Sequence, residues 1–322
     1  MTPFAIKQLI KKDMSAVDDL LKTTLNANTP VINDICQYII QNGGKRLRPA
    51  IALLSGHVVS LNTERNVQLA TIIEAIHTAT LLHDDVVDDS KLRRGKATAN
   101  IAWDNPRAVL SGDFLYATAC VHMADFGNAR AMQVLTRAMA CIAEGEVQQL
   151  NNCHDPDIDE ANYFQVIYGK TAKLFEAACQ LPAVLAGADE ATERAMAAYG
   201  CHIGTAFQLI DDILDYTADA KQMGKNLGDD LAEGKPTLPL IYAMQHAPQH
   251  DADVIRSAIQ TGDTNSISQI QQILETTQAI TYTQDCAIRE TEKANAALSL
   301  LPDSRYKDAL LSIGPQAIKR KH

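Results

Sequence analysis

The stretch between Thr63 and Asp89 constrains the fold of this chain more than any other. Its middle reads LATIIEAIHTATLLHDDVVDD, and as a helix it is apolar on almost every side. A helix that is hydrophobic all round is buried, because it has no polar face to turn towards water. We therefore expect this helix, above all residues 71–89, to lie at the centre of the fold with other helices around it.

Helix boundary signals recur along the rest of the chain. Thr29-Pro30 and Asn105-Pro106 are typical helix starts, Gly43-Gly44 is typical of a helix end, and Pro49 opens the next helix. Strand-like alternation with hairpin dipeptides is absent, so segment 90–98 is predicted as a loop and the chain, residues 1–322, as one all-α domain. Further helices are predicted over residues 128–152, 159–187, 189–217, 236–247, 250–261, 264–277, 279–300 and 303–320.

The charge balance excludes several classes of partner. Lys and Arg number 29 and Asp and Glu number 39, which gives a net charge of −10. Such a chain has no global attraction to nucleic acid or anionic lipid, so any polyanion it binds needs a local basic cluster or metal ions. We expect no nucleic-acid partner.

The compartment follows from cysteine usage and from the lack of targeting segments. The seven cysteines form no C-x-x-C pair, which favours reduced core thiols. The amphipathic N-terminus does not resemble a signal peptide, and no segment has the roughly 18 apolar residues of a membrane helix. We expect a cytoplasmic protein whose membrane contact is peripheral at most.

Two aspartate clusters follow apolar helical sequence, HDDVVDD at 83–89 and QLIDDILDY at 208–216. Residues four apart share one face of a helix, so Asp84 pairs with Asp88 and Asp211 with Asp215. Like charges at this spacing repel, and near a buried face the repulsion grows. A solvated surface would explain one such cluster, but two favour a hard cation, Mg²⁺ or Mn²⁺, that bridges carboxylates to phosphates.

Basic residues gather near these clusters in the sequence. A Gly-Gly turn precedes three cations in GGKRLRP, residues 43–49, and Arg93-Arg94-Gly95 follows the first aspartates. Arg pairs with phosphate bidentately and Lys acts as a point charge, although any one of them is more often a solvated surface residue. No P-loop, G-x-G-x-x-G or G-x-S-x-G motif competes. The pattern predicts a polyphosphate ligand held by metal on one side and by cations on the other.

The ordered motifs resemble those of the trans (E-type) polyprenyl diphosphate synthases over about residues 40–240. They are GGKRLRP, the D-D-x-x-D of 84–88 with Arg93-Arg94-Gly95, Lys170-Thr171, FQLIDDILD and GKNLGDDLAEGKPTLPL. The stretches HTATLLHDDVVDD and EGEVQQL are most similar to octaprenyl members from bacteria. The resemblance implies a single large helical bundle around a deep central cavity, and a homodimer.

The resemblance also implies roles for matching residues. The substrates would be isopentenyl diphosphate and an allylic diphosphate such as farnesyl diphosphate. The prenyl product would become the side chain of a quinone. Two Mg²⁺ ions would bind Asp84 and Asp88, a third would bind Asp211, and Asp215 would assist through water. The allylic diphosphate would contact Arg93, Lys170 and Lys225, with Lys235 close behind, while isopentenyl diphosphate would contact Lys45, Arg48, His77 and Arg94. Thr171 and Gln208 would line the reaction centre.

The helix that carries Asp84 also bears on product length. Ala79 and Thr80 lie one turn before Asp84 and Ile76 lies two turns before it. Shorter-chain members resemble one another in having aromatic residues there, whereas the small residues here would let a growing tail pass. We expect an octaprenyl product, within a range from hexaprenyl to decaprenyl. Met123 and Leu135 are candidates for the floor of the tunnel, although apolar helix residues are core by default.

Other interpretations stay open at this point. One is a synthase of another length, such as geranylgeranyl diphosphate. A terpene cyclase would use D-D-x-x-D without GGKRLRP, and a silent partner subunit would show eroded aspartates. A helical scaffold that binds divalent ions would lack the diphosphate clamp, and His77 could be an ordinary satisfied core histidine.

Overall fold

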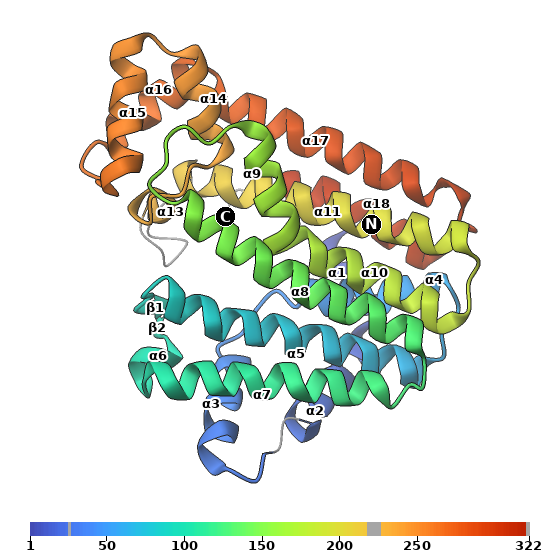
Figure 1. Ribbon diagram of the computed structural model, residues 1–322. Helices are drawn as coiled ribbons and strands as arrows, with labels where there is room; N and C mark the ends of the chain where they lie inside the picture. Colours follow the sequence, from blue (N-terminus) through green and yellow to red (C-terminus); the bar gives the residue numbers. More distant parts are fainter. Residues whose placement is uncertain (25–26, 218–226, 320–322) are drawn as a thin grey trace. The chain divides into compact units, whose positions relative to one another are not determined.

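The computed structural model describes residues 1–24, 27–217 and 227–319, and almost all of its regular structure is helical (Figure 1). The all-α fold expected from the sequence is confirmed. By internal contacts the chain divides into two compact units. The first comprises residues 1–138, 174–200 and 297–312, and the second comprises 139–173, 201–296 and 313–322. The single domain expected over 1–322 stays a prediction.

The first unit contains the N-terminal helices and one small hairpin. Its elements are α1 (Pro3–Leu9), α2 (Lys11–Thr24), α3 (Pro30–Gln41), α4 (Leu47–Val58), α5 (Thr63–Val87), β1 (Leu92–Arg93), β2 (Lys96–Ala97), α6 (Ala99–Ala102), α7 (Asn105–Ala124), the start of α8 (Ala129–Asn152), most of α10 (Lys173–Ala186), the start of α11 (Glu190–Thr217), η2 (Leu298–Leu300) and the start of α18 (Arg305–Ile318).

Helix α5 forms the core of the first unit, as its apolar sequence predicts. It packs against α2, α4 and α7, and α7 runs alongside it in Figure 1. The side chains of Leu69, Ile73 and Ile76 are completely buried. The Asn62 side chain caps the start of α5 by accepting hydrogen bonds from two backbone N–H groups of the first turn. Burial on several sides holds α5 in one orientation from this cap to its aspartates.

The segment predicted as a loop contains a two-residue hairpin instead. Leu92 pairs with Ala97 and Arg93 with Lys96 in an antiparallel register. The two residues between the strands, Arg94 and Gly95, both have positive φ, 54° and 75°, as a type I′ turn requires. The strands are too short to show alternation, and the turn lacks the usual Asn-Gly signal. Elsewhere the differences are small, since α4 begins at Leu47 rather than at Pro49.

The second unit is built around the C-terminal half of α11. Leu209, Ile210 and Leu214 are buried there together with Tyr163 and Ile167. Its elements are the rest of α8, α9 (Glu160–Ile167), the π-helical turn η1 (Tyr168–Ala172), the rest of α11, α13 (Asp229–Ala232), α14 (Leu238–His246), α15 (Gln249–Thr261), α16 (Ile267–Thr276), α17 (Ala279–Ala297) and the end of α18.

Within residues 1–24, 27–217 and 227–319, no helix is both long and apolar enough to cross a bilayer.

Candidate functional site

The first aspartate cluster lies at the end of α5. The helix is regular to Val87, and Asp88 forms its C-cap with an N–H that donates to the Asp84 carbonyl at 2.8 Å. Asp84 and Asp88 are therefore one turn apart on the same side, and both are half-buried. This is the arrangement that the four-residue spacing predicts.

Asp85, the middle aspartate of this cluster, does different work. Its side chain is almost completely buried, and one carboxylate oxygen accepts from both Nε and Nη2 of Arg93 at 2.8 Å. A buried carboxylate without such a partner would be strongly destabilising. Arg93, which the family resemblance assigns to the allylic diphosphate, is thus anchored to the helix end by Asp85.

A cluster of guanidinium groups lies farther back along α5. Arg46 at the start of α4 donates to the buried Glu74 carboxylate at 2.5 Å. Burial raises the pKa of Glu74, and the Arg46 charge opposes that shift. Arg48 places Nη1 3.1 Å from Nε2 of His77 and stacks its guanidinium over Phe175 at 4.5 Å. The structure therefore brings together Arg48 and His77, two residues to which the family resemblance assigns one substrate.

His77 is held neutral by its surroundings. Burial lowers its pKa well below the usual 6.5, and the charges of Arg48, Arg93, Arg94 and Arg46 lower the pKa further. Because Arg48 can only donate, Nε2 of the neutral imidazole accepts and Nδ1 carries the proton. The four arginine charges that act on His77 indicate that the region concentrates positive charge suited to a diphosphate.

Gly44 and the hairpin turn determine where Arg94 lies. A Cβ built on Gly44 would lie 3.0 Å from Nη1 of Arg94, so the glycine leaves room for that guanidinium. Burial lowers the pKa of Arg94, as does the charge of Arg93. Lys45 is exposed.

The residues expected to shape product length lie in the first unit. Ile76, Ala79, Met123 and Leu135 are completely buried, and Thr80 is half-buried with its hydroxyl bonded to the His77 carbonyl at 2.8 Å. Their roles stay predictions.

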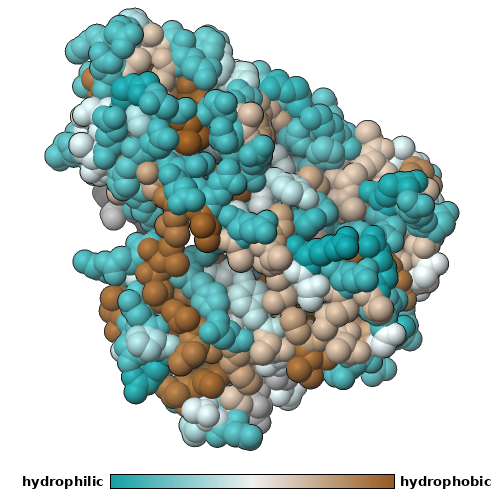
Figure 2. All heavy atoms as spheres, viewed as in Figure 1, coloured by the Kyte–Doolittle hydropathy of each residue, from teal (hydrophilic) through white to brown (hydrophobic). Residues whose placement is uncertain are grey.

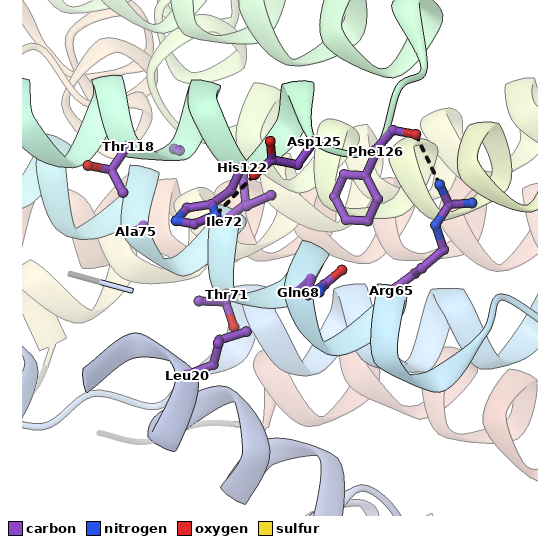
Figure 3. A pocket seen from close by; sticks show the side chains of 11 residues that line it. Leu20, Arg65, Gln68, Thr71, Ile72, Ala75, Thr118, His122, Asp125 and Phe126 are labelled. Atoms are coloured by element: carbon purple, nitrogen blue, oxygen red, sulfur yellow. Dashed lines mark hydrogen bonds and ion pairs between the residues drawn. The ribbon is translucent and has the colours of Figure 1, made fainter. Parts of the chain in front are cut away.

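A cavity of about 290 Å³ lies farther along the same helix, between α2, α5 and α7 (Figure 3). Ile72 and Ala75 line it from α5, and His122 lines it from α7. Figure 3 shows Arg65 donating to the Phe126 carbonyl at 3.0 Å at one end. Ala75 lies nine residues before Asp84, about 13 Å along the helix axis.

The second aspartate cluster lies on α11, in the second unit. Asp211 is half-buried, whereas Asp212 and Asp215 are almost completely buried. Asp212 accepts from the Tyr163 hydroxyl at 2.5 Å and from the Gln208 amide at 2.7 Å. Burial raises the pKa of Asp212, and the nearby Asp230 charge raises it further. As in the first cluster, the middle aspartate is buried among partners.

Asp215 organises the loop that carries Gly228-Asp229-Asp230. Its carboxylate accepts from the Asp230 N–H at 3.2 Å, and its carbonyl accepts from the Gly228 N–H at 3.1 Å. One carboxylate oxygen of Asp215 is therefore already engaged with the backbone, which suits the assisting role expected for it.

Lys170 and Thr171 lie in the π-helical turn η1. Such turns are rare and are frequent at functional sites. Lys170 Nζ donates to Glu146 and to Gln149, both at 2.7 Å, and the Thr171 hydroxyl donates to Gln208 Oε1 at 2.8 Å. Gly145 of α8 touches this turn, since a Cβ on it would lie 2.6 Å from the Lys170 nitrogen. This close approach positions the Lys170 backbone beside Glu146.

A cavity of about 90 Å³ brings several predicted residues together. Lys170, Thr171, Gln208 and Lys235 all line it. Lys235 is ion-paired with Glu233, and its backbone N–H donates to the Asp230 carbonyl at 2.8 Å. Lys225 lies outside the described residues. The cavity wall also includes Tyr163, Asp212 and Asp230.

The donor set suits a hard cation completed by a phosphate ligand. In the described part of the chain, no three acidic, histidine or cysteine side chains lie close enough to form a metal site. The outer carboxylates, Asp84 with Asp88 and Asp211 with Asp215, supply oxygens alone, and Mg²⁺ commonly takes few carboxylates together with substrate phosphates. The residues present therefore fit Mg²⁺ bound with a diphosphate.

Several contributors were missed by the sequence analysis. The buried middle aspartates had a signal, because Asp85 lies three residues after Leu82 and Asp212 three after Leu209, on buried stripes of their helices. Tyr163 had none, since its contact to Asp212 joins residues 49 apart. Glu74, Glu146 and Gln149 were also missed, whereas Arg46 and Asp230 lie in quoted motifs but were given no role of their own.

Comparison with known proteins identifies a family and several similar proteins. The polyprenyl synthetase family model matches residues 29–277. The octaprenyl diphosphate synthase of Escherichia coli (strain K12) is 48% identical over 318 residues, which cover 98% of each chain. The all-trans-nonaprenyl-diphosphate synthase (geranyl-diphosphate specific) of Rhodobacter capsulatus is 44% identical over 312 residues, covering 97% of this chain and 96% of that protein. The crystal structure of polyprenyl synthase from Caulobacter crescentus, complexed with calcium and isoprenyl diphosphate, matches with a TM-score of 0.94 at 38% identity, covering 98% of this chain and 97% of that chain.

Proposed function

The chain belongs to the polyprenyl synthetase family, and on this premise we propose that it condenses isopentenyl diphosphate onto farnesyl diphosphate to make all-trans-octaprenyl diphosphate for quinone side chains. The observation that carries the proposal is the pairing of oxygen-only carboxylate sets with concentrated cationic charge. A reaction between two diphosphates needs both. The 48% identity to an octaprenyl diphosphate synthase supports the class and the product length.

The cationic cluster supports the binding of isopentenyl diphosphate. The Arg48 side chain is held by stacking on Phe175 and by a hydrogen bond to His77, and Arg94 lies over Gly44. Arginine recognises phosphate oxygens bidentately, and a neutral His77 adds an Nδ1–H donor at no cost of further repulsion. In this proposal Lys45, at the exposed end of the cluster, contributes a point charge.

The reaction breaks the allylic C–O bond and forms an allylic cation and free diphosphate. The double bond of isopentenyl diphosphate attacks the cation, and a proton is then lost to the released diphosphate. Asp84 and Asp88 would hold two Mg²⁺ ions, or Mn²⁺ in their place, and Asp211 would hold a third with Asp215 assisting through water. Ions held in this way would supply Lewis-acid stabilisation of the leaving oxygen. Lys170, Lys225 and Lys235 add positive charge where negative charge develops.

The product length is supported by small side chains along α5. Ala79 is completely buried and Thr80 is half-buried, and the cavity beside Ala75 lies farther along the helix. Small residues leave room for an apolar tail that an aromatic ring would block. A second candidate is nonaprenyl diphosphate, which the Rhodobacter capsulatus relative favours.

Product analysis tests the proposal. The purified chain is incubated with labelled isopentenyl diphosphate, Mg²⁺ and either farnesyl or geranyl diphosphate, and products are resolved by length. We expect octaprenyl diphosphate. Products of geranylgeranyl length would refute the octaprenyl assignment, a cyclic hydrocarbon would indicate a terpene cyclase, and no turnover with either primer would favour a silent subunit or a scaffold.

A homodimer formed through α7 is part of this proposal. Leu110 and Val121, three turns apart on one face of α7, are 62% and 60% exposed, and Ile101 of α6 is 52% exposed. Hydrophobic side chains gather over α6 and α7 at the lower left of Figure 2. Exposed apolar patches commonly mark association sites. Val121→Glu should convert a dimer into a monomer in sedimentation, whereas an unchanged mass would remove this face from the interface.

The cytoplasm is the proposed compartment. The seven cysteines all lie in the described residues and form no disulfide there, as is usual where thiols are kept reduced. Contact with the membrane would be peripheral, for release of the apolar product.

A further inference from the structure

We propose that Tyr163 is a positioning residue of the condensation reaction, which through Asp212 and Gln208 determines how the Thr171 hydroxyl faces the substrate cavity. The inference rests on the proposed function and adds a residue to it. Tyr163 lies on α9, directly before the π-helical turn that carries Thr171. All four residues line the same cavity of about 90 Å³.

The four side chains form one continuous chain of hydrogen bonds. The Tyr163 hydroxyl donates to Asp212 Oδ2 at 2.5 Å, and Gln208 Nε2 donates to Asp212 Oδ1 at 2.7 Å. At the other end, the Thr171 hydroxyl donates to Gln208 Oε1 at 2.8 Å. Every link is therefore within normal hydrogen-bond distance.

The direction of these hydrogen bonds follows from which atoms of each group donate and which accept. Because Tyr163 donates to one carboxyl oxygen of Asp212 and Gln208 Nε2 donates to the other, the NH₂ side of the Gln208 amide faces Asp212. The amide oxygen must then face Thr171, so the Thr171 hydroxyl donates its hydrogen to Gln208. The Thr171 oxygen consequently presents its lone pairs, rather than its hydrogen, to other groups in the cavity.

That polarity suits a positively charged intermediate. An oxygen fixed with its lone pairs outward stabilises an allylic cation without having to reorient during the reaction. A freely rotating hydroxyl would spend part of its time with the hydrogen towards the cation, which is repulsive.

Tyr163 is suited to holding the first link. Its side chain is 5% exposed, and burial together with the Asp212 charge raises its pKa well above the usual value, so the hydroxyl keeps its proton and donates. The Asp159 side chain caps the helix that carries it by accepting from the Asn162 N–H at 2.8 Å. Without the Tyr163 hydroxyl as a donor, the Asp212 carboxyl group can turn towards other donors and release Gln208.

Steady-state kinetics of Tyr163→Phe test the proposal. The loss of this buried hydrogen bond is enough for a fall of about tenfold in kcat, with KM for both substrates within about twofold. Tyr199→Phe is the matched control, because Tyr199 is also buried and its hydroxyl donates to the Leu310 carbonyl at 2.8 Å. This control should keep the kcat of the unmodified enzyme.

A double-mutant cycle identifies the route of the effect. In a Thr171→Val background, Tyr163→Phe should lower kcat by less than about twofold, because the hydroxyl that it orients is gone. In a Thr171→Ser background, which restores the hydroxyl, the tenfold loss should return. The same cycle in a Gln208→Met background gives an independent readout if the Thr171→Val pair does not fold.

The outcomes separate this inference from the proposed function. An unmodified enzyme without prenyltransferase activity refutes the proposed function. An active enzyme in which Tyr163→Phe keeps normal kcat refutes the role of Tyr163 alone. A tenfold loss that persists in Thr171→Val also refutes it, because the effect would then not pass through Thr171.

Discussion

Replacing Gly145 by alanine should slow the enzyme much more than it destabilises the fold. Gly145 lies in α8 where that helix meets the π-helical turn of Lys170 and Thr171. An added Cβ would lie 2.6 Å from the Lys170 nitrogen and 2.8 Å from the Gly169 carbonyl carbon. Both neighbours are backbone, so neither can rotate away.

The size of the effect follows from the geometry. Ordinary Cβ contacts begin at 3.4 Å, so α8 and the turn must separate by about 0.8 Å. Overpacking of this kind costs about 1–3 kcal/mol, and alanine returns about 1 kcal/mol through its better helix propensity. The net loss of stability is therefore small. A displacement near 1 Å can however cost about a hundredfold in rate, so we expect kcat to fall by about ten- to a hundredfold.

The measurements are kcat, KM and the thermal unfolding midpoint. Gly314→Ala is the matched control, because an added Cβ there would lie 2.4 Å from Thr291 Cγ2, on a helix that carries none of the site residues. It brings the same gain in helix propensity. We expect Gly314→Ala to keep kcat within about twofold, even where its unfolding midpoint falls by about 2–4 °C per kcal/mol lost.

Equal kinetics for both variants would refute the reasoning. If Gly145→Ala kept normal kcat, the close approach of α8 to the turn would have no bearing on Lys170. If both variants lost activity in proportion to stability, the loss would be an effect of folding.

Three further predictions concern the first unit and the metal. Asp84→Ala and Asp211→Ala should each lower kcat by about a hundredfold or more, and excess chelator should abolish turnover of the unmodified enzyme; near-normal turnover in either variant would overturn the metal assignment. Thr80→Phe should shorten products to farnesyl or geranylgeranyl length on chromatography, and unchanged length would exclude this wall. Because the pKa of His77 is lowered in the fold, the unfolded chain takes up its proton first as the pH falls below 6.5, so the fold loses stability there and keeps it above. Denaturation midpoints of His77→Gln should fall less between pH 7.5 and 5, and identical slopes would contradict a neutral His77.

The sequence predicted most helices because their periodicity and caps are local. The helix starts signalled by Thr29-Pro30 and by Asn105-Pro106 both appear in the structure where the signals lie. The π-helical turn could not be predicted, because one extra residue in a turn leaves the 3.6-residue periodicity of the sequence almost unchanged.

The candidate site was predicted in its composition but only partly in its arrangement. The family resemblance indicated Thr171 and Gln208, and the structure joins them by a hydrogen bond. Which aspartate of a cluster is buried as an anchor and which faces outward depends on the fold. The sequence does not reveal this, because the side chains are identical. Asp85 and Asp212 are anchors inside motifs that look uniform in sequence.

The continuity of α5 has a consequence for how such an enzyme can diversify. One unbroken helix carries Ile76, which we propose lines the path of the tail, the imidazole of His77 and the carboxylate of Asp84. Each added residue would turn everything beyond it by about 100° and move it by about 1.5 Å. A single insertion between Ile76 and Asp84 would thus place His83 in the phase that Asp84 now occupies. If α5 lines the path of the tail as proposed, substitutions within it could change product length, whereas an insertion or deletion would also rotate Asp84 and His77 relative to Ile76.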